Sequence, residues 1–100
     1  MAKVTVKFVV KADAKSAYLC GSTDNLGAWD AKGAVALTKA DGVFSVSKQF
    51  EANSTVEFKV LGGKTWDKVE KGNWGEDVAN HTFVAAKGLT VEVEVPNFAK

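Results

Sequence analysis

Alternation of apolar and polar residues with a period of two is the feature that most constrains this chain. In the first such run, Val4, Val6, Phe8 and Val10 alternate with lysines and a threonine. A strand that buries only one of its faces produces this pattern. Similar runs occupy residues 44–50, 56–60 and 89–95, and shorter strand candidates lie at residues 16–21, 35–38 and 82–84.

Turn signals separate these runs, as in Asp41-Gly42, Gly62-Gly63 and Lys87-Gly88. No long window repeats apolar residues with the spacing of a helix. Several short strands at regular spacing in a chain of 100 residues are typical of a sandwich of two sheets. The sequence therefore predicts an all-β fold, an immunoglobulin-like antiparallel β-sandwich of about seven to eight strands. We expect residues 1–100 to form a single domain.

Composition and charge exclude several classes of protein. The formal net charge is +1, lysines and acids are mixed along the chain, and arginine is absent, so we expect no nucleic-acid partner. No stretch approaches the length of about 20 apolar residues that spans a bilayer, so we expect no membrane segment. Cys20, the single cysteine, lies in an apolar run and is expected to be a buried thiol without a disulfide partner.

Catalytic and metal-binding arrangements are weakly represented. His81 is the single histidine, and it lies at the start of a predicted strand, where a hydrogen-bonded surface role is expected. A pair of glycosidase carboxylates would have to come from Glu70, Glu76 and Asp77, in a small sandwich without a deep cleft. We therefore expect no catalytic residue, no bound metal and no cofactor, although a shallow calcium site in this acidic loop stays open.

The three tryptophans, Trp29, Trp66 and Trp74, all fall in irregular segments rather than in the alternating runs. Trp29 lies in residues 22–33, and the other two lie in residues 64–80. Long segments without periodicity are more often functional than structural. An exposed indole suits sugars, because C–H faces stack on its ring while nearby amides and carboxylates bond to hydroxyls. The alternative is a structural role, in which one or more of these indoles covers the end of the sandwich core.

The chain resembles the starch-binding domains of carbohydrate-binding module family 20. The residues that carry the resemblance are Tyr18-Leu19-Cys20-Gly21-Ser22, Leu26-Gly27-Ala28-Trp29-Asp30, Val56-Glu57-Phe58-Lys59-Val60, and Trp74 with Asn80. Their order and spacing cover nearly the whole chain. The Tyr-Leu-x-Gly-Ser and Leu-Gly-x-Trp-Asp motifs are the specific part of the match.

The resemblance implies a carbohydrate-binding platform of two tryptophans that stack on consecutive glucose rings. These would be Trp29 and Trp74, with Lys59 and Asn80 bonding to sugar hydroxyls. The acid after the second tryptophan would be Glu76.

Three departures from the family pattern affect the site residues. Residues 74–80 are one residue longer than usual, which leaves Glu76 and Asp77 as alternatives. The loops that carry the second-site tyrosines have no aromatic residue here, so that site is expected to be absent or rebuilt. The segment Gly62-Gly63-Lys64-Thr65-Trp66-Asp67 is similar to a loop of starch-binding modules in amylopullulanases, so Trp66 would widen the platform or replace one of its members.

The function expected from these features is non-catalytic binding of α-1,4-glucan, with starch, glycogen or maltooligosaccharides as partners. We expect a monomer or part of a larger chain, accessory to an amylolytic enzyme. The absence of a signal peptide leaves a cytoplasmic location open beside the extracellular one expected for a module of a secreted protein. The alternatives are an immunoglobulin-like protein-interaction or adhesion module, which would use the aromatics as an interface, and an accessory domain that binds nothing.

Overall fold

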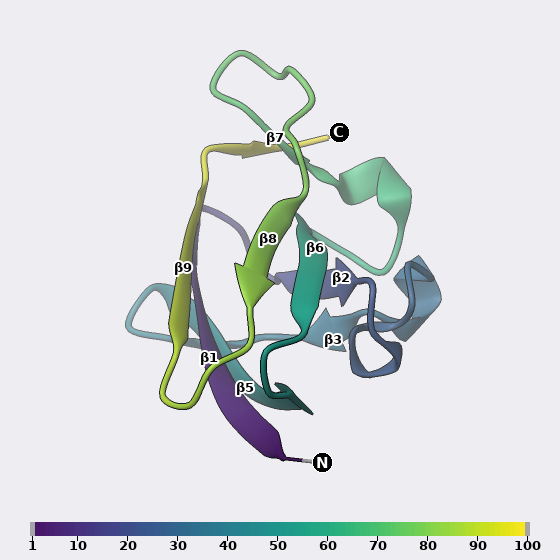
Figure 1. The fold of residues 1–100 in the computed structure, drawn as a ribbon. Coiled ribbons are helices and arrows are strands. Elements are labelled where there is room, and N and C mark those ends of the chain that lie inside the picture. Colours follow the sequence, from purple (N-terminus) through teal and green to yellow (C-terminus); the bar gives the residue numbers. More distant parts are fainter. Residues whose placement is uncertain (1, 100) are drawn as a thin grey trace.

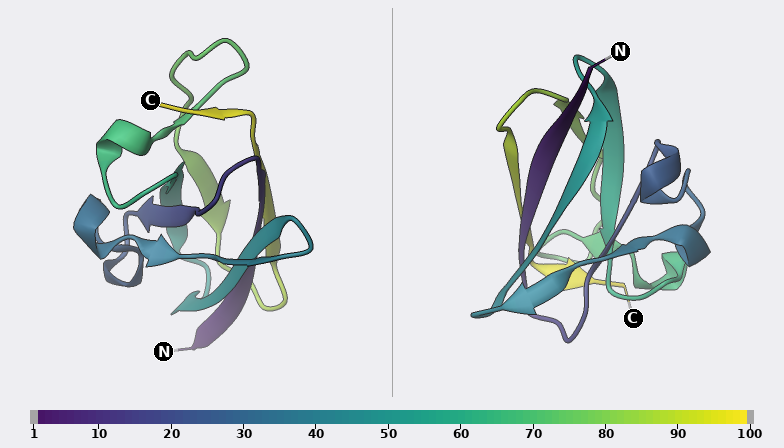
Figure 2. Two further views of the ribbon diagram at one scale, coloured as in Figure 1. Left: turned by 180° about the vertical axis from the view of Figure 1, so that it is seen from behind. Right: turned by 90° about the horizontal axis from the view of Figure 1, so that it is seen from below.

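Two four-stranded sheets face each other in the computed structural model, which describes residues 2–99 (Figure 1, Figure 2). The first sheet has the order β4 (Thr38–Ala40), β5 (Val43–Glu51), β1 (Lys3–Ala12) and β9 (Thr90–Val95). The second has the order β3 (Val35–Ala36), β2 (Tyr18–Gly21), β6 (Thr55–Leu61) and β8 (His81–Val84). The predicted β-sandwich is confirmed.

Short elements complete the fold. A separate two-stranded sheet pairs β7 (Glu70–Lys71) with β10 (Asn97–Phe98). Three one-turn 3₁₀ helices lie in the loops of the described chain, namely η1 (Asp24–Leu26), η2 (Ala31–Gly33) and η3 (Trp66–Lys68). None of the helices in residues 2–99 has the length and apolar character to cross a membrane. The described chain thus has ten strands rather than seven to eight, because two-residue strands show no periodicity.

One strand pairing departs from the predicted antiparallel arrangement. β1 runs antiparallel to β5 but parallel to β9, with Lys7 opposite Thr90 and Ala12 opposite Val95. The segment after β8 carries the chain from one sheet to the other, so β9 reaches β1 as a crossover and not as its hairpin partner (Figure 1). The predicted antiparallel β-sandwich thus holds one parallel pairing, at this edge.

The main core lies between the two sheets and is built from the inward residues of the alternating strands. Phe8 packs edge to face on Phe50, Phe58 and Phe83, with ring centroids 5.4–5.9 Å apart. Such edge-to-face contacts stabilise a core by about 1 kcal/mol each beyond burial alone. The alternation in β1, β5, β6 and β9 was thus a correct guide to the buried face.

A second, smaller apolar cluster covers the outer face of the second sheet. It contains Cys20 and Leu61 together with Ala31 and Ala34 of the η2 segment, and Val69 packs against it. Because both faces of β2 are covered, this strand reads as a continuous apolar run. Cys20 is fully buried, as predicted, and the cluster supports the loops that carry the candidate site.

Candidate functional site

Trp29 is held by an unusual run of backbone conformations. Gly27, Ala28 and Trp29 have φ values of 85°, 47° and 67°, so three consecutive residues lie in the left-handed region. Left-handed backbone is costly for residues other than glycine, and it gathers at functional sites. The amide N–H of Trp29 donates to the carbonyl of Gly21 over 2.9 Å, which fixes the half-buried residue at the end of β2.

The glycine of this loop is required by packing as well as by φ. A Cβ atom on Gly27 would lie 2.8 Å from the carbonyl oxygen of Gly33 and 2.9 Å from that of Asp30. The Asp30 carboxylate also accepts the amide N–H of Lys32 over 3.0 Å and caps η2. The Leu-Gly-x-Trp-Asp motif therefore specifies a tightly folded loop that presents one indole.

Trp66 comes from a second closed loop, residues 62–69. The amide N–H of Gly62 donates to the carbonyl of Lys68 over 2.8 Å, and Leu61 forms a β-bridge with Val69 at the base. The Thr65 hydroxyl accepts an N–H at the start of η3. These bonds hold Trp66 at the surface with 40% of its side chain exposed.

The structure brings Trp29 and Trp66 together. The Trp66 Nε1–H donates to the backbone carbonyl of Trp29 over 3.3 Å, and the ring centroids lie 6.2 Å apart at an interplanar angle of 35°. The helical turns next to the two residues, η2 and η3, lie on the same side of the molecule in each view (Figure 1, Figure 2). We call this pair of rings the tryptophan platform.

An open hollow of about 510 Å³ lies over the tryptophan platform. Its lining residues are Trp29, Lys59, Trp66, Val69, Asp77 and Asn80. Four of the six predicted site residues therefore share one surface. A larger hollow of about 720 Å³ between β1 and residues 87–90 has no aromatic side chain in its described lining. Chemistry rather than volume thus marks the first hollow as the candidate site.

The polar side chains of the hollow have defined positions. Lys59 points away from the buried Phe58, as alternation predicts, and its Nζ donates to the carbonyl of Val78 over 2.5 Å. Asp77 forms an ion pair with Lys71, whose hydrogen bond and charge lower the pKa of that carboxyl. The hollow therefore offers an ammonium group and an ionised carboxylate, beside the exposed Asn80 at the start of β8.

Trp74 lies elsewhere, at the tip of the loop between β7 and β8. Its side chain is 92% exposed, and it is not among the described residues that line the hollow. The backbone of this turn is held by Asn97, whose amide donates to the carbonyls of Gly72 and Asn73 over 2.9 and 3.1 Å. Figure 1 shows this loop extending from one end of the sandwich, away from η2.

Glu76, the acid predicted to follow the second tryptophan in the site, contacts the backbone of the same turn. Glu76 Oε1 accepts the amide N–H of Trp74 over 2.9 Å, and its carboxylate lies so close to Gly72 that a Cβ there would overlap it. Asp77, the alternative acid of the sequence analysis, is the one that reaches the hollow. Glu76 is thus directed toward the backbone of its own loop rather than toward the hollow.

The carboxylates considered for a glycosidase pair are each engaged separately. Glu70 is buried and bonded to His81 and to the backbone of Val60, Glu76 caps a turn, and Asp77 is paired with Lys71. His81 is hydrogen-bonded, as expected. Within residues 2–99, no group of three or more histidine, cysteine or acidic side chains is arranged to hold a metal ion.

Val69 is the lining residue that sequence reasoning did not identify. It lies outside any periodic strand, and a lone valine in a loop carries no signal of a binding surface. The Trp-Asp motif at Trp66 and Asp67 was the one sequence signal for this loop. It pointed to the first residue of η3, and Val69 follows three residues later as the C-cap of that helix.

A β-sandwich that presents a pair of aromatic rings beside polar side chains defines a small binding module, in which loops on a rigid scaffold form the site. The chain belongs to the starch binding domain family, whose model matches residues 2–94. This family, carbohydrate-binding module family 20, consists of non-catalytic binding modules. The resemblance stated from the sequence is therefore confirmed.

Solved structures agree with this assignment. The isolated family 20 module of a maltotetraose-forming amylase from Pseudomonas saccharophila STB07 has a TM-score of 0.69 at 22% identity, covering 91% of this chain and 99% of that one. A family 15 glucoamylase from Hypocrea jecorina has a TM-score of 0.76 at 19% identity over the whole of this chain. The glucoamylase of Hormoconis resinae has a TM-score of 0.74 at 19% identity over 95% of it.

These identities establish the fold alone. The chain spans 18% of the length of each of the two glucoamylases. A search of curated protein sequences returned no match.

Proposed function

We propose that this single domain, residues 1–100, binds α-1,4-glucans, namely starch, glycogen and maltooligosaccharides, without a chemical step. The observation that carries the proposal is the tryptophan platform, in which Trp29 and Trp66 lie side by side and line an open hollow. Membership of the starch binding domain family supports the ligand class.

The spacing and tilt of the rings fit consecutive sugar units. Ring centroids 6.2 Å apart would place one indole under each of two neighbouring glucose rings. The angle of 35° between the planes would follow a curved α-1,4 chain better than a flat β-1,4 chain. Each stacking contact should contribute on the order of 1 kcal/mol beyond area burial. Two such contacts give a weak single site, with a dissociation constant of roughly micromolar to millimolar size.

Lys59 and Asn80 would bond to sugar hydroxyls at the rim of the platform. Both line the hollow, and the ammonium of Lys59 keeps donors beyond the one that serves Val78. Asp77 would accept hydrogen bonds from sugar hydroxyls on the same side, in the position expected for Glu76 or Asp77.

Trp74 would act as an outlying contact with the same polysaccharide. Its indole is almost fully exposed on a turn whose backbone is held by Asn97 and Glu76, so the backbone that carries the ring need not be ordered on binding. Glu76 would position this turn, and a long polymer could reach both surfaces where a short oligosaccharide would occupy the platform alone.

We further propose that the domain acts as an extracellular accessory module of an amylolytic enzyme. Weak binding is sufficient for that task, because a repetitive polymer raises the effective concentration of an attached enzyme. The glucoamylases with the same fold support this setting.

The test is calorimetric titration of maltoheptaose into the native protein and three variants, Trp29→Ala, Trp66→Ala and Trp74→Ala. Loss of one stacking contact should weaken binding roughly five- to tenfold in the first two variants and leave the third near the native value. Val84→Ala, which removes another exposed apolar side chain, is the matched control. An absence of heat at millimolar sugar would reject the proposal.

Retention on an amylopectin gel separates the role of Trp74 from the protein-interaction alternative. Trp74→Ala should elute earlier than the native protein from the polymer, although it binds maltoheptaose normally. If native protein is not retained at all, the exposed aromatics would belong to a protein interface instead.

A further inference from the structure

Glu70 is the one charged side chain among the buried residues of the described chain. It is 3% exposed and lies in the two-residue strand β7, directly after the hollow-lining Val69. Burial of a carboxylate is costly unless its oxygens are hydrogen-bonded. The two hydrogen-bond partners of Glu70 indicate why a carboxylate is buried at this position.

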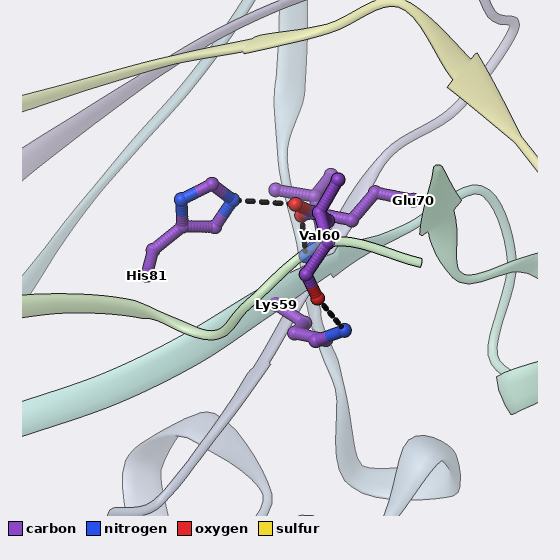
Figure 3. A network of polar contacts seen from close by, with 5 residues as sticks. Lys59, Val60, Glu70 and His81 are labelled. Carbon is purple, nitrogen blue, oxygen red and sulfur yellow. Dashed lines mark hydrogen bonds and ion pairs between the residues drawn. The ribbon is translucent and has the colours of Figure 1, made fainter. Parts of the chain in front are cut away.

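The carboxylate joins three strands. Its Oε2 accepts the amide N–H of Val60 in β6 over 2.6 Å, and its Oε1 lies 2.5 Å from Nε2 of His81 in β8 (Figure 3). The ladder between β6 and β8 ends at the pair Phe58 and His81, so Val60 lies two residues beyond it. Glu70 therefore accepts an N–H that the sheet leaves without a strand partner. We call Glu70, Val60 and His81 the Glu70 cluster.

Each member of the Glu70 cluster is a chain neighbour of a residue that lines the hollow. Lys59 precedes Val60, Val69 precedes Glu70, and Asn80 precedes His81. Successive residues of extended chain point to opposite sides. Val60 and the Glu70 carboxylate therefore lie beneath the surface that their neighbours form, and Figure 3 shows the Lys59 side chain directed away from the Glu70 carboxylate.

The position of Trp66 depends on the same hydrogen bonds of Glu70. η3 ends at Lys68, so only Val69 separates it from β7. Apart from Glu70, β7 is held by its pairing with β10 and by the short bridges from Leu61 to Val69 and from Lys71 to Asp77. A strand of two residues has too few ladder bonds to fix its own position. The hydrogen bonds from Glu70 to β6 and β8 fix the position of β7, which its few ladder bonds do not.

We propose that Glu70 is a positioning residue for the tryptophan platform, which locks the Trp66 loop to the strands that carry Lys59 and Asn80. The expected effect of Glu70 on sugar affinity rests on the proposed glucan binding. Its expected effect on the position of Trp66 does not. A leucine of similar size would fill the space but would leave the Val60 N–H and the His81 ring without their acceptor.

The experiment compares Glu70→Gln and Glu70→Leu with Val93→Ala, a control in the buried part of β9 on the opposite sheet. The first readout, without sugar, is the chemical shift and hydrogen exchange of the Trp66 indole N–H. The second is maltoheptaose affinity, and the third is the midpoint of thermal unfolding.

Glu70→Leu should shift the indole resonance, speed its exchange and weaken sugar binding roughly tenfold. Glu70→Gln, which keeps an acceptor for Val60, should stay within about threefold of the native affinity. Val93→Ala should lower the unfolding midpoint and leave the indole resonance and affinity unchanged. If Glu70→Leu behaves like Val93→Ala, Glu70 only stabilises the core and the proposal is overturned.

A second pair of variants covers the case in which Glu70→Leu does not fold. His81 is half-buried, so His81→Leu and His81→Gln remove or keep a donor to Glu70 with less disturbance. His81→Leu should move the Trp66 indole signal and His81→Gln should move it less; equal spectra in both would overturn the proposal. An indole signal that moves in a protein that binds no sugar would reject the glucan function and leave the positioning role intact.

Discussion

The indole N–H of Trp66 donates to the backbone carbonyl of Trp29, 37 positions earlier in the chain. One hydrogen bond of 3.3 Å thus links the loop that follows β2 with the loop that follows β6. Because the bond uses the indole nitrogen of Trp66, it does not occupy the face of that ring.

Trp66→Phe tests whether this bond orients the ring. Phenylalanine keeps an aromatic face but has no donor, so the loop should lose its fixed angle to Trp29 while stacking persists. An exposed neutral hydrogen bond is at the low end of its range, so we expect sugar affinity to fall about threefold. Calorimetry checks this value, and a loss as large as that of Trp66→Ala would mean that the larger indole face is what matters.

Gly27→Ala should destabilise the protein because both φ and packing oppose a side chain there. With φ at 85° and a Cβ only 2.8 Å from the carbonyl of Gly33, the expected cost is about 2–3 kcal/mol. Gly42→Ala is the matched control, since Gly42 has φ of 78° and open space around it. That variant should lose about 1 kcal/mol, as measured by urea unfolding. Equal losses of stability in the two variants would show that backbone conformation alone sets the cost of the substitution.

Cys20 should be unreactive in the native protein. Burial, and to a lesser degree the charge of Asp30, raise the pKa of this thiol above its ordinary value of 9.0. The thiolate is the reactive form, so a thiol reagent should label the protein fully in urea and hardly at all without it. Rapid native labelling would contradict the burial seen here.

The same shift in the pKa of Cys20 makes stability fall at high pH. The unfolded thiol loses its proton at a lower pH than the folded one, so unfolding is favoured as the pH rises past 9.0. Cys20→Ala should flatten this part of the stability profile in urea unfolding at a series of pH values. A variant with an unchanged slope would exclude the thiol as its cause.

Asp77 should stay ionised to an unusually low pH. The hydrogen bond and charge of Lys71 lower the pKa of Asp77 below its ordinary value of 3.8. The contribution of the pair to stability is therefore complete above 3.8 and is lost as the pH falls through the lower, folded value. Carboxyl carbon shifts recorded by NMR should give a midpoint below 3.8 that rises toward it in Lys71→Met.

The sandwich could be predicted because its long strands bury one face each. In β1 and β6 the alternating residues are the ones that reach the core, so burial follows directly from the pattern. The parallel contact between β1 and β9 could not be predicted in this way, since alternation reports which face is buried and not which strand lies alongside.

The arrangement of the candidate site could be predicted only in part, and the separate positions of Trp66 and Trp74 show why. In the sequence both lie in one segment without periodicity, residues 64–80, and the spacing from Lys59 does not tell which of them lies beside Trp29. The choice depends on β7 and β10, which pair over two residues each, and on the buried Glu70. Elements of two residues have no period, and a single acid in a polar loop gives no sign that it is buried.

The left-handed run at Gly27, Ala28 and Trp29 has a consequence for the kinetics of recognition. A loop whose conformational cost is already met during folding has little left to lose when a ligand arrives, so the entropic penalty of association is small. Encounters should therefore succeed often, and glucans of different lengths should differ mainly in how fast they leave. If the proposed function holds, a surface formed in this way would release one stretch of polymer and engage the next without refolding.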